Sequence, residues 1–315
     1  MPEKHTSLRR PDHLGVHSID HFCLAVPDLH EAEDFFDAFG LQVCHAGADL
    51  ELFCDENPQC WGRLRKGSRK RLEYLSFGAF EDDIPRFRQH LKSLGIELLP
   101  APPQSDGLGL WFHDPAGQLL EIRAAVRCAP TAKSTFAEQS SAPGERGSVS
   151  RSQAPLVRPR RLAHVAIFTD DVSRGVNFYR DVLGLRLSDR SADIVAFLHG
   201  AHGSEHHLVA LVKSGGPGLH HSSWDVGSVQ DIGLGSKQMI ERGYRRAWGL
   251  GRHVLGANYF YYVRDPWGSH AEYSADMDYI PIDLDWSGTD QAVEDAMYLW
   301  GPDVPEDFVT NFELP

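Results

Sequence analysis

The sequence predicts an α+β protein made of two tandem copies of one module, each combining a mixed β-sheet with helices. Two observations support this prediction. Short segments along the 315-residue chain alternate between apolar and polar side chains, which is the period of a half-buried strand. The second half of the chain also repeats the motifs of the first half in the same order, which indicates an internal duplication.

Each copy is expected to begin with a strand and a helix. Residues 19–28 read IDHFCLAVPD, and residues 162–171 read LAHVAIFTDD. An amphipathic run follows in both copies and ends at a glycine, Gly40 in the first and Gly184 in the second. Glycine often ends a helix because it adopts the left-handed conformation without a steric penalty.

Each copy is expected to end with a turn and a further strand. Residues 111–121 correspond to residues 262–272, and both segments contain the turn signal Asp-Pro-x-Gly and close on a glutamate. The offset between the copies is 143 residues at the first histidine, His21 against His164, and 151 residues at the glutamate. So small a drift indicates one module repeated with short loop insertions.

Three residues of the second copy are candidate metal ligands: His164, His221 and Glu272. Each lies in a short segment that reads as a strand. The chain has 17 histidines and 44 acidic residues, so each histidine taken alone is more simply a structural one. Two imidazoles and one carboxylate together form the facial triad that holds non-haem Fe(II) with positions open to substrate and oxygen, and Mn(II) accepts the same ligand types.

The first copy lacks the middle ligand. Tyr74 aligns with His221, although His21 and Glu121 are kept. One imidazole and one carboxylate would bind a metal weakly, so the first copy is interpreted as structural and the second as catalytic. His21 is then expected to be a core histidine with a hydrogen-bond partner.

These motifs resemble the vicinal oxygen chelate superfamily, and specifically its two-domain type I extradiol ring-cleavage dioxygenases. The resemblance covers roughly residues 15–280. It implies the glyoxalase/bleomycin-resistance/extradiol dioxygenase fold, in which tandem modules of paired βαβββ units curl their mixed sheets around a metal cavity. It also implies an Fe(II)-dependent enzyme, with Mn(II) as a substitute, that inserts both atoms of O2 into a substituted catechol with meta ring cleavage during aromatic-compound degradation.

The resemblance further implies three catalytic residues. The family places an acid-base histidine before the second ligand in a His-His pattern, which here is His206-His207; His207 is preferred, but its spacing to the ligand is one residue short, so His206 stays open. His253, in the family pattern Gly-Arg-His, would donate a hydrogen bond to the bound oxygen. Tyr262 would stabilise the substrate anion. The simpler alternatives are a solvated, His-rich loop around His207 and a core aromatic at Tyr262.

Four residues are expected to bind the substrate ring or its substituent: Ala166, His199, Trp248 and Arg252. The small Ala166 leaves room for a substituted ring. Trp248 stands near the place where family members that accept carboxylate-bearing catechols tend to carry a basic residue. This favours an uncharged, hydrophobic substituent, while Arg252 keeps a polar one open.

Two other functions compete with the dioxygenase. A glyoxalase-like lyase or isomerase would usually take ligands from both modules, and Tyr74 speaks against that. A metal-free protein that sequesters an aromatic compound would not need all three ligands.

Composition limits the partners. A net charge of −13 argues against nucleic acid or an anionic membrane surface. No run is long and apolar enough for a membrane span and no export signal is recognisable, so a cytoplasmic location is expected. The five cysteines lack zinc-like pairing and are expected to be reduced thiols. The expected partners are a catecholic substrate and O2, and the resemblance implies a homo-oligomer.

The chain is expected to divide into four parts. These are a structural module over residues 1–126, a linker rich in Ser, Pro and Ala over 127–160, a catalytic metal-binding module over 161–280, and an acidic, aromatic tail over 281–315. The linker is long enough either to pack across a subunit or to stay mobile. The aromatics of the tail suggest that it docks, over the mouth of the catalytic module or on a neighbouring subunit.

Overall fold

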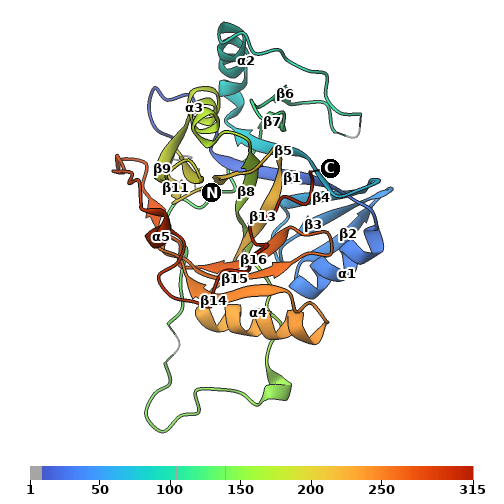
Figure 1. The fold of residues 1–315 in the computed structure, drawn as a ribbon, viewed down its shortest axis with the longest axis vertical. Coiled ribbons are helices and arrows are strands. Elements are labelled where there is room, and N and C mark those ends of the chain that lie inside the picture. Colours follow the sequence, from blue (N-terminus) through green and yellow to red (C-terminus); the bar gives the residue numbers. More distant parts are fainter. Residues whose placement is uncertain (1–8, 104, 139, 315) are drawn as a thin grey trace, which may run out of the picture.

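The structure, a computed structural model, describes residues 9–103, 105–138 and 140–314. The first eight residues of the predicted structural module therefore lie outside the described residues. Two large sheets make up the fold, one from each half of the chain (Figure 1). The predicted α+β fold of duplicated modules is confirmed.

The first sheet has seven strands in the order β2-β3-β4-β1-β5-β7-β6. Its strands are β1 (Ser18–Val26), β2 (Gln42–Ala46), β3 (Asp49–Phe53), β4 (Cys60–Lys66), β5 (Arg71–Ala79), β6 (Leu110–His113) and β7 (Leu119–Ala124). Its helices are α1 (Leu29–Phe39), the short η1 (Glu81–Asp83) and α2 (Ile84–Ser93).

The second sheet has eight strands in the order β14-β15-β16-β13-β8-β12-β10-β9. Its strands are β8 (Arg161–Thr169), β9 (Leu185–Ser191), β10 (Val195–Gly200), β12 (Val209–Lys213), β13 (Gly218–Asp225), β14 (Ala247–Arg252), β15 (Tyr259–Arg264) and β16 (His270–Ala275). The remaining elements are α3 (Val172–Leu183), α4 (Val229–Glu241), the tail helix α5 (Val293–Ala296), η2 (Arg151–Gln153) in the linker, and a small pair of β11 (Ser204–Glu205) with β17 (Tyr279–Ile280).

The two sheets share one pairing scheme. In the first, β1 pairs parallel with β4 and antiparallel with β5; in the second, β8 pairs parallel with β12 and antiparallel with β13. Among the described residues, the first sheet has no strand that corresponds to β14 of the second sheet. Between α2 and β6 only an isolated bridge, Leu99 to Trp111, is formed. Three prolines at positions 100, 102 and 103 lie beside that bridge, and proline has no N–H for a ladder.

The helix ends of the two halves match as the sequence predicts. Asp28 and Asp171 accept backbone N–H hydrogen bonds at the starts of α1 and α3, and Gly40 and Gly184 end the same helices with φ of 97° and 70°. A Cβ at Gly40 would lie 2.1 Å from the carbonyl oxygen of Val157, so the chain entering β8 passes directly over this glycine.

The halves pack tightly against each other. The ring of Phe39, at the end of α1, stacks on Tyr273 of β16 with centroids 3.9 Å apart, and the Tyr273 hydroxyl donates to the Phe39 carbonyl at 2.8 Å. Helices α1 and α4 lie side by side at this contact (Figure 1). Strand β16 is therefore supported by the first half of the chain.

The linker and the tail both pack against the two sheets of their own chain. In the linker, Phe136 stacks on Tyr259 with centroids 5.8 Å apart. The tail crosses back towards the first sheet (Figure 1), where Glu313 pairs with the buried Lys70 at 2.7 Å. None of the described helices is long and apolar enough to cross a membrane.

Candidate active site

Three neighbouring strands carry the predicted metal ligands. His164 lies on β8, His221 on β13 and Glu272 on β16, and Ser223 of β13 is in register with both His164 and Glu272. Side chains two residues apart on a strand share a face, so His221 joins the other two on one face of the sheet. The ligand atoms of the three residues all lie within 4.8 Å of one another.

The atoms converge as a metal site requires. His164 Nε2 lies 3.0 Å from His221 Nε2 and 3.3 Å from Glu272 Oε2, and His221 Nε2 lies 3.6 Å from the same oxygen. Glu272 Oε2 is buried without a hydrogen-bond partner among the described residues, whereas Oε1 accepts from Asn258 at 3.1 Å. A buried, unpartnered carboxylate oxygen facing two imidazole nitrogens fits a divalent cation.

The protonation states also fit a cation. Burial lowers the pKa of His221 well below its ordinary value, which keeps the ring neutral, as a ligand must be. Burial alone would raise the pKa of Glu272, but its electrostatic interaction with His164 outweighs burial, and the pKa is lowered. Glu272 is therefore an ionised carboxylate.

His207 lines the cavity beside these ligands, and its ring centroid is 4.1 Å from that of His164. Burial lowers the pKa of His207 well below its ordinary value, so the ring is neutral. His206, the alternative acid-base residue, is fully buried and does not line the cavity. The geometry thus favours His207 of the pair.

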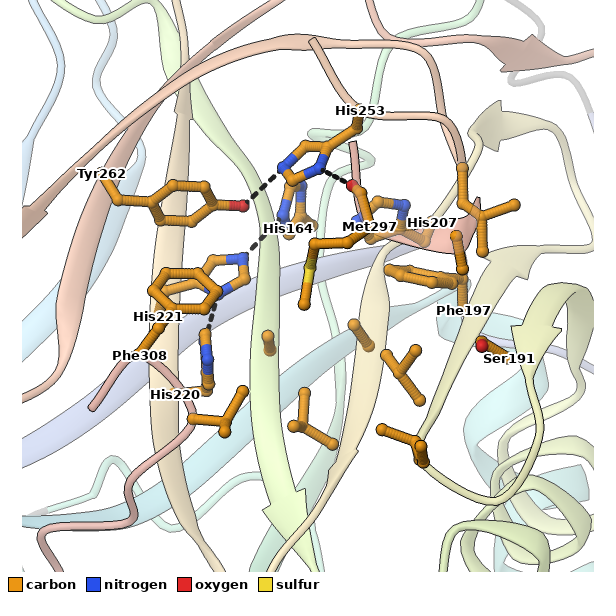
Figure 2. Close-up of a pocket in the computed structure, with 18 of the residues that line it drawn as sticks. His164, Ser191, Phe197, His207, His220, His221, His253, Tyr262, Met297 and Phe308 are labelled. Carbon is orange, nitrogen blue, oxygen red and sulfur yellow. Dashed lines mark hydrogen bonds between the residues drawn. The ribbon is translucent and has the colours of Figure 1, made fainter. Parts of the chain in front are cut away.

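His253 and Tyr262 form a hydrogen-bonded pair at the edge of the site. His253 Nδ1 lies 2.7 Å from the carbonyl oxygen of Met297 and must donate to it. A neutral His253 then offers Nε2 as an acceptor, 2.9 Å from the Tyr262 hydroxyl (Figure 2). The predicted donor role of His253 therefore requires a second proton on its ring. Burial and the charge of Glu272 raise the pKa of Tyr262 well above its ordinary value, so Tyr262 keeps its proton.

The cavity in front of the ligands has a volume of about 110 Å³ and mainly apolar walls. Figure 2 shows His164, His207 and His253 close together among the residues that line the cavity. Beyond the site histidines and Tyr262, the lining residues are Ala166, Ser191, Ile194, Val195, Phe197, Ala210, Val212, His220, Leu255, Asn258, Val293, Ala296, Met297, Phe308 and Val309.

One of the four predicted substrate-binding residues, Ala166, lines this cavity, and the other three do not. His199 shares a face of β10 with Phe197 but lies one step beyond it, where its Nδ1 bonds the Ser188 hydroxyl at 2.8 Å. Trp248 packs behind Tyr262, with stacked rings 5.4 Å apart. Arg252 turns away and places its guanidinium over the Tyr259 ring. Direct contact of these three residues with the substrate therefore stays a prediction that the lining of the cavity does not support.

Several residues that line the cavity or contact a candidate ligand were not predicted from the sequence. Phe197, Met297 and Phe308 line the cavity, and Met297 and Phe308 come from the tail, whose composition suggested docking but not which of its residues reach the cavity. His220 places its Nδ1 2.6 Å from Nδ1 of His221 and so orients that ligand. The sequence did offer one indication of this role, because His220 directly precedes the candidate ligand His221.

The corresponding place in the first half holds no complete ligand set. His21 bonds Asp20 at 2.7 Å and the Tyr74 hydroxyl at 3.2 Å, and Glu121 accepts from Ser76 at 2.5 Å. His21 is thus a buried histidine with partners, as expected from the sequence.

Comparison with known proteins agrees with this geometry. Residues 161–273 match the family described as the Glyoxalase/Bleomycin resistance protein/Dioxygenase superfamily. Metapyrocatechase 2 of Cupriavidus necator is 52% identical over 304 residues, which cover 96% of this chain and 94% of that protein. A manganese-dependent 2,3-dihydroxybiphenyl 1,2-dioxygenase of Geobacillus genomosp. 3 is 24% identical and covers 90% of this chain and 93% of its own length. The crystal structure of BphC, a halotolerant catechol dioxygenase, matches with a TM-score of 0.74 at 20% identity over 95% of this chain and 98% of that one.

The fold and the three-ligand site define a metal-dependent enzyme on the vicinal oxygen chelate scaffold. Within that superfamily the chain belongs to the extradiol dioxygenases, which open aromatic rings by meta cleavage. The predicted enzyme class is confirmed, and it sets aside the lyase and the metal-free binding protein as alternatives.

Proposed function

We propose that the protein is an Fe(II)-dependent extradiol dioxygenase that acts on catechols carrying an uncharged, apolar substituent and inserts both atoms of O2 with meta ring cleavage. The observation that carries the proposal is the His164, His221 and Glu272 cluster, whose two histidines line an apolar cavity. Mn(II) is the alternative metal, because a relative is named manganese-dependent and the ligand types suit both ions.

A divalent metal held by these ligands would supply a Lewis acid for two adjacent hydroxyls and an open position for O2. The chain supplies the proton handling. The neutral His207 ring can accept a proton from a hydroxyl of the bound diol and return it later in the reaction. The Tyr262 hydroxyl remains protonated and donates to Nε2 of a neutral His253, so it can donate to a substrate oxygen when His253 carries a second proton and donates to the Tyr262 oxygen instead. His253 holds Tyr262 in position through the 2.9 Å hydrogen bond.

The walls of the cavity support an apolar substituent. Phe197, Val212, Val293 and Val309 lie along it, and its described lining residues include no Lys, Arg, Asp or Glu. A carboxylate on the substituent would lose its hydration there without gaining a cationic partner. Alkyl- and aryl-substituted catechols are therefore proposed over carboxylated ones.

Oxygen uptake tests the function. The Fe(II)-loaded protein is mixed under air with catechol, 3-methylcatechol, 2,3-dihydroxybiphenyl and 3,4-dihydroxybenzoate, while oxygen consumption and the product spectrum are recorded. One O2 consumed per diol, a coloured ring-opened product and a preference for the uncharged diols are expected. A metal-loaded protein that consumes no oxygen with any of these diols contradicts the proposal, and a matched sample loaded with Mn(II) decides between the metals.

We also propose the chain divisions 1–126, 127–160, 161–280 and 281–315, a homo-oligomeric state, a cytoplasmic location, and no nucleic-acid or membrane partner. The net charge of −13 supports the last point. Light scattering with in-line size-exclusion chromatography tests the oligomeric state, and a mass of about one chain contradicts it.

A further inference from the structure

A chain of three side chains runs from the cavity wall into the protein. His207 Nδ1 lies 3.0 Å from His206 Nδ1, and His206 Nε2 lies 2.7 Å from Asp189 Oδ2. His206 is 0% exposed and Asp189 is 5% exposed. Only His207 of the three lines the cavity, so the other two can affect a substrate only through it.

The buried carboxylate at the end of this chain is held by the tail. Thr289 donates to Asp189 Oδ1 from both its backbone N–H and its hydroxyl at 2.6 Å, and Trp286 Nε1 lies 3.4 Å from Oδ2. Burial alone would raise the pKa of Asp189, but the hydrogen bonds from His206 and Thr289 outweigh it and lower the pKa. Asp189 is therefore ionised and accepts hydrogen bonds only.

An irregularity in β9 directs Asp189 towards the histidines. The register between β9 and β10 shifts at Phe197, so that Ser188 is the extra residue of a bulge. Ser188 and Asp189 then both reach His206, since the Ser188 hydroxyl donates to the His206 carbonyl and Asp189 takes the ring N–H. In a regular strand these neighbours would face opposite sides.

The hydrogen bonds fix where the protons lie. Because Asp189 can only accept, His206 must carry a proton on Nε2. When His206 carries this one proton only, it presents Nδ1 as an acceptor, and His207 donates to it from its own Nδ1. The remaining nitrogen of His207, Nε2, is left unprotonated.

We propose that Asp189 and His206 are positioning residues that hold His207 in the tautomer with an unprotonated Nε2 available to the cavity, and that Thr289 holds Asp189 in place. This rests on the proposed function of His207 as the acid-base residue. The same logic governs the buried aspartate of serine proteases, where loss of the carboxylate leaves the geometry but gives the wrong histidine tautomer. Here the carboxylate of Asp189 sets the tautomer of His206, and His206 in turn sets the tautomer of His207.

The variant Asp189→Asn tests the proposal. The two Thr289 donors keep the amide oxygen, so the amide NH2 faces His206 and both histidines change tautomer, which puts a proton on His207 Nε2. We expect kcat to fall about 100-fold or more with KM changed less than about threefold, since positioned acid-base groups contribute roughly 10²–10⁴-fold. Thr289→Val removes one of the two donors and should lower kcat by a smaller factor. This variant replaces Asp189→Asn as the test if Asp189→Asn does not fold.

The direct readout is the tautomer itself. The full-length chain is labelled with 15N-histidine, loaded with diamagnetic Zn(II) and studied by NMR. The signals of the His207 ring nitrogens are those that disappear from the spectrum of His207→Gln. Their shifts should exchange between the Nδ1-H and Nε2-H patterns in Asp189→Asn. Asp114→Asn, a buried aspartate that accepts backbone N–H groups in the first half of the chain, is the matched control and should leave these shifts and kcat unchanged.

The outcomes separate this inference from the function on which it rests. Unchanged His207 shifts and unchanged kcat in Asp189→Asn overturn the inference, as does an Nε2-H pattern in the unmodified protein. A fully active His207→Gln overturns the acid-base assignment instead, whatever the tautomer.

Discussion

At the scale of single residues, Glu272 serves the site with both of its oxygens. Oε2 faces His164 and His221, while Oε1 accepts a hydrogen bond from Asn258. Asn258 also donates to Ser274 at 3.0 Å, so its amide is fixed from two sides. It lines the cavity wall and sets the direction in which the carboxylate points.

Asn258→Ala should therefore weaken metal binding rather than abolish folding. Partners of metal ligands typically contribute about 10–100-fold in metal affinity. Titration of the metal-free protein with Fe(II) under anaerobic conditions measures the change. Asn57→Ala, whose amide bonds the Arg160 carbonyl away from the site, is the control, and equal affinities for the two variants would show that Asn258 does not orient the ligand.

Tyr262 tests the other edge of the site. Tyr262→Phe removes the hydroxyl bonded to His253 but keeps the ring that stacks on Trp248. We expect kcat to fall by about 10²-fold, because a positioned proton donor contributes on that order, with thermal stability nearly unchanged. The neighbouring Tyr261→Phe is the matched control, since that ring faces the other side of the strand. Similar kinetics for both variants would exclude a role for the hydroxyl.

At the scale of elements, the tail is part of the site rather than an appendage. It supplies the Met297 carbonyl that fixes His253, and Phe308, which packs against Tyr262 with centroids 5.0 Å apart. Near its end, Glu313 accepts from the backbone N–H groups of Leu72 and Leu219 and pairs with Lys70. The tail thus joins both halves of the chain.

Glu313→Ala should destabilise the protein strongly. Lys70 is only 5% exposed and would be left as a buried charge without its carboxylate partner. Breaking a buried pair from one side typically costs about 3–5 kcal/mol of unfolding free energy. Denaturant unfolding measures this, with Glu306→Ala, an exposed glutamate of the same tail, as the control; a cost below about 1 kcal/mol would show that Lys70 reaches water.

The elements also show what could be predicted from sequence. Strand period and the internal repeat pointed to the three candidate ligands that the structure brings together, because neighbouring strands of one sheet place residues of matching register side by side. The wall residues Met297 and Phe308 could not be predicted individually, since their positions depend on how a tail packs whose one helix in the described residues, α5, is four residues long. His199, expected at the cavity from sequence, does not line it, because position along a strand, and not only its face, decides what reaches the cavity.

At the scale of the whole molecule, buried histidines make stability depend on pH. Burial, together with nearby charged or titratable groups, lowers the pKa of His17 and His202 to about 4 and that of His199 to about 3. The unfolded chain takes up these protons near pH 6.5 and the folded one only near pH 3–4, so stability is complete above pH 6.5 and is lost as the pH falls.

We expect each of these histidines to cost about 1–2 kcal/mol of stability between pH 7 and pH 5. Urea unfolding at the two pH values measures the total. His202→Gln should reduce the loss, whereas His45→Gln, whose side chain is 68% exposed, should leave it unchanged. Equal losses in all three proteins would show that burial of His202 does not set the pH dependence.

The stacking of Phe39 on Tyr273 limits how this enzyme can be recombined with its relatives. Tyr273 follows Glu272 directly on β16, so the strand that carries the carboxylate ligand rests on the first half of the chain. A chimera that takes each half from a different parent exchanges that support, even if all three ligands are inherited intact. Crossover points chosen to keep Phe39 with Tyr273, and Lys70 with Glu313, should preserve the site, and those that separate these pairs should need compensating changes at the seam.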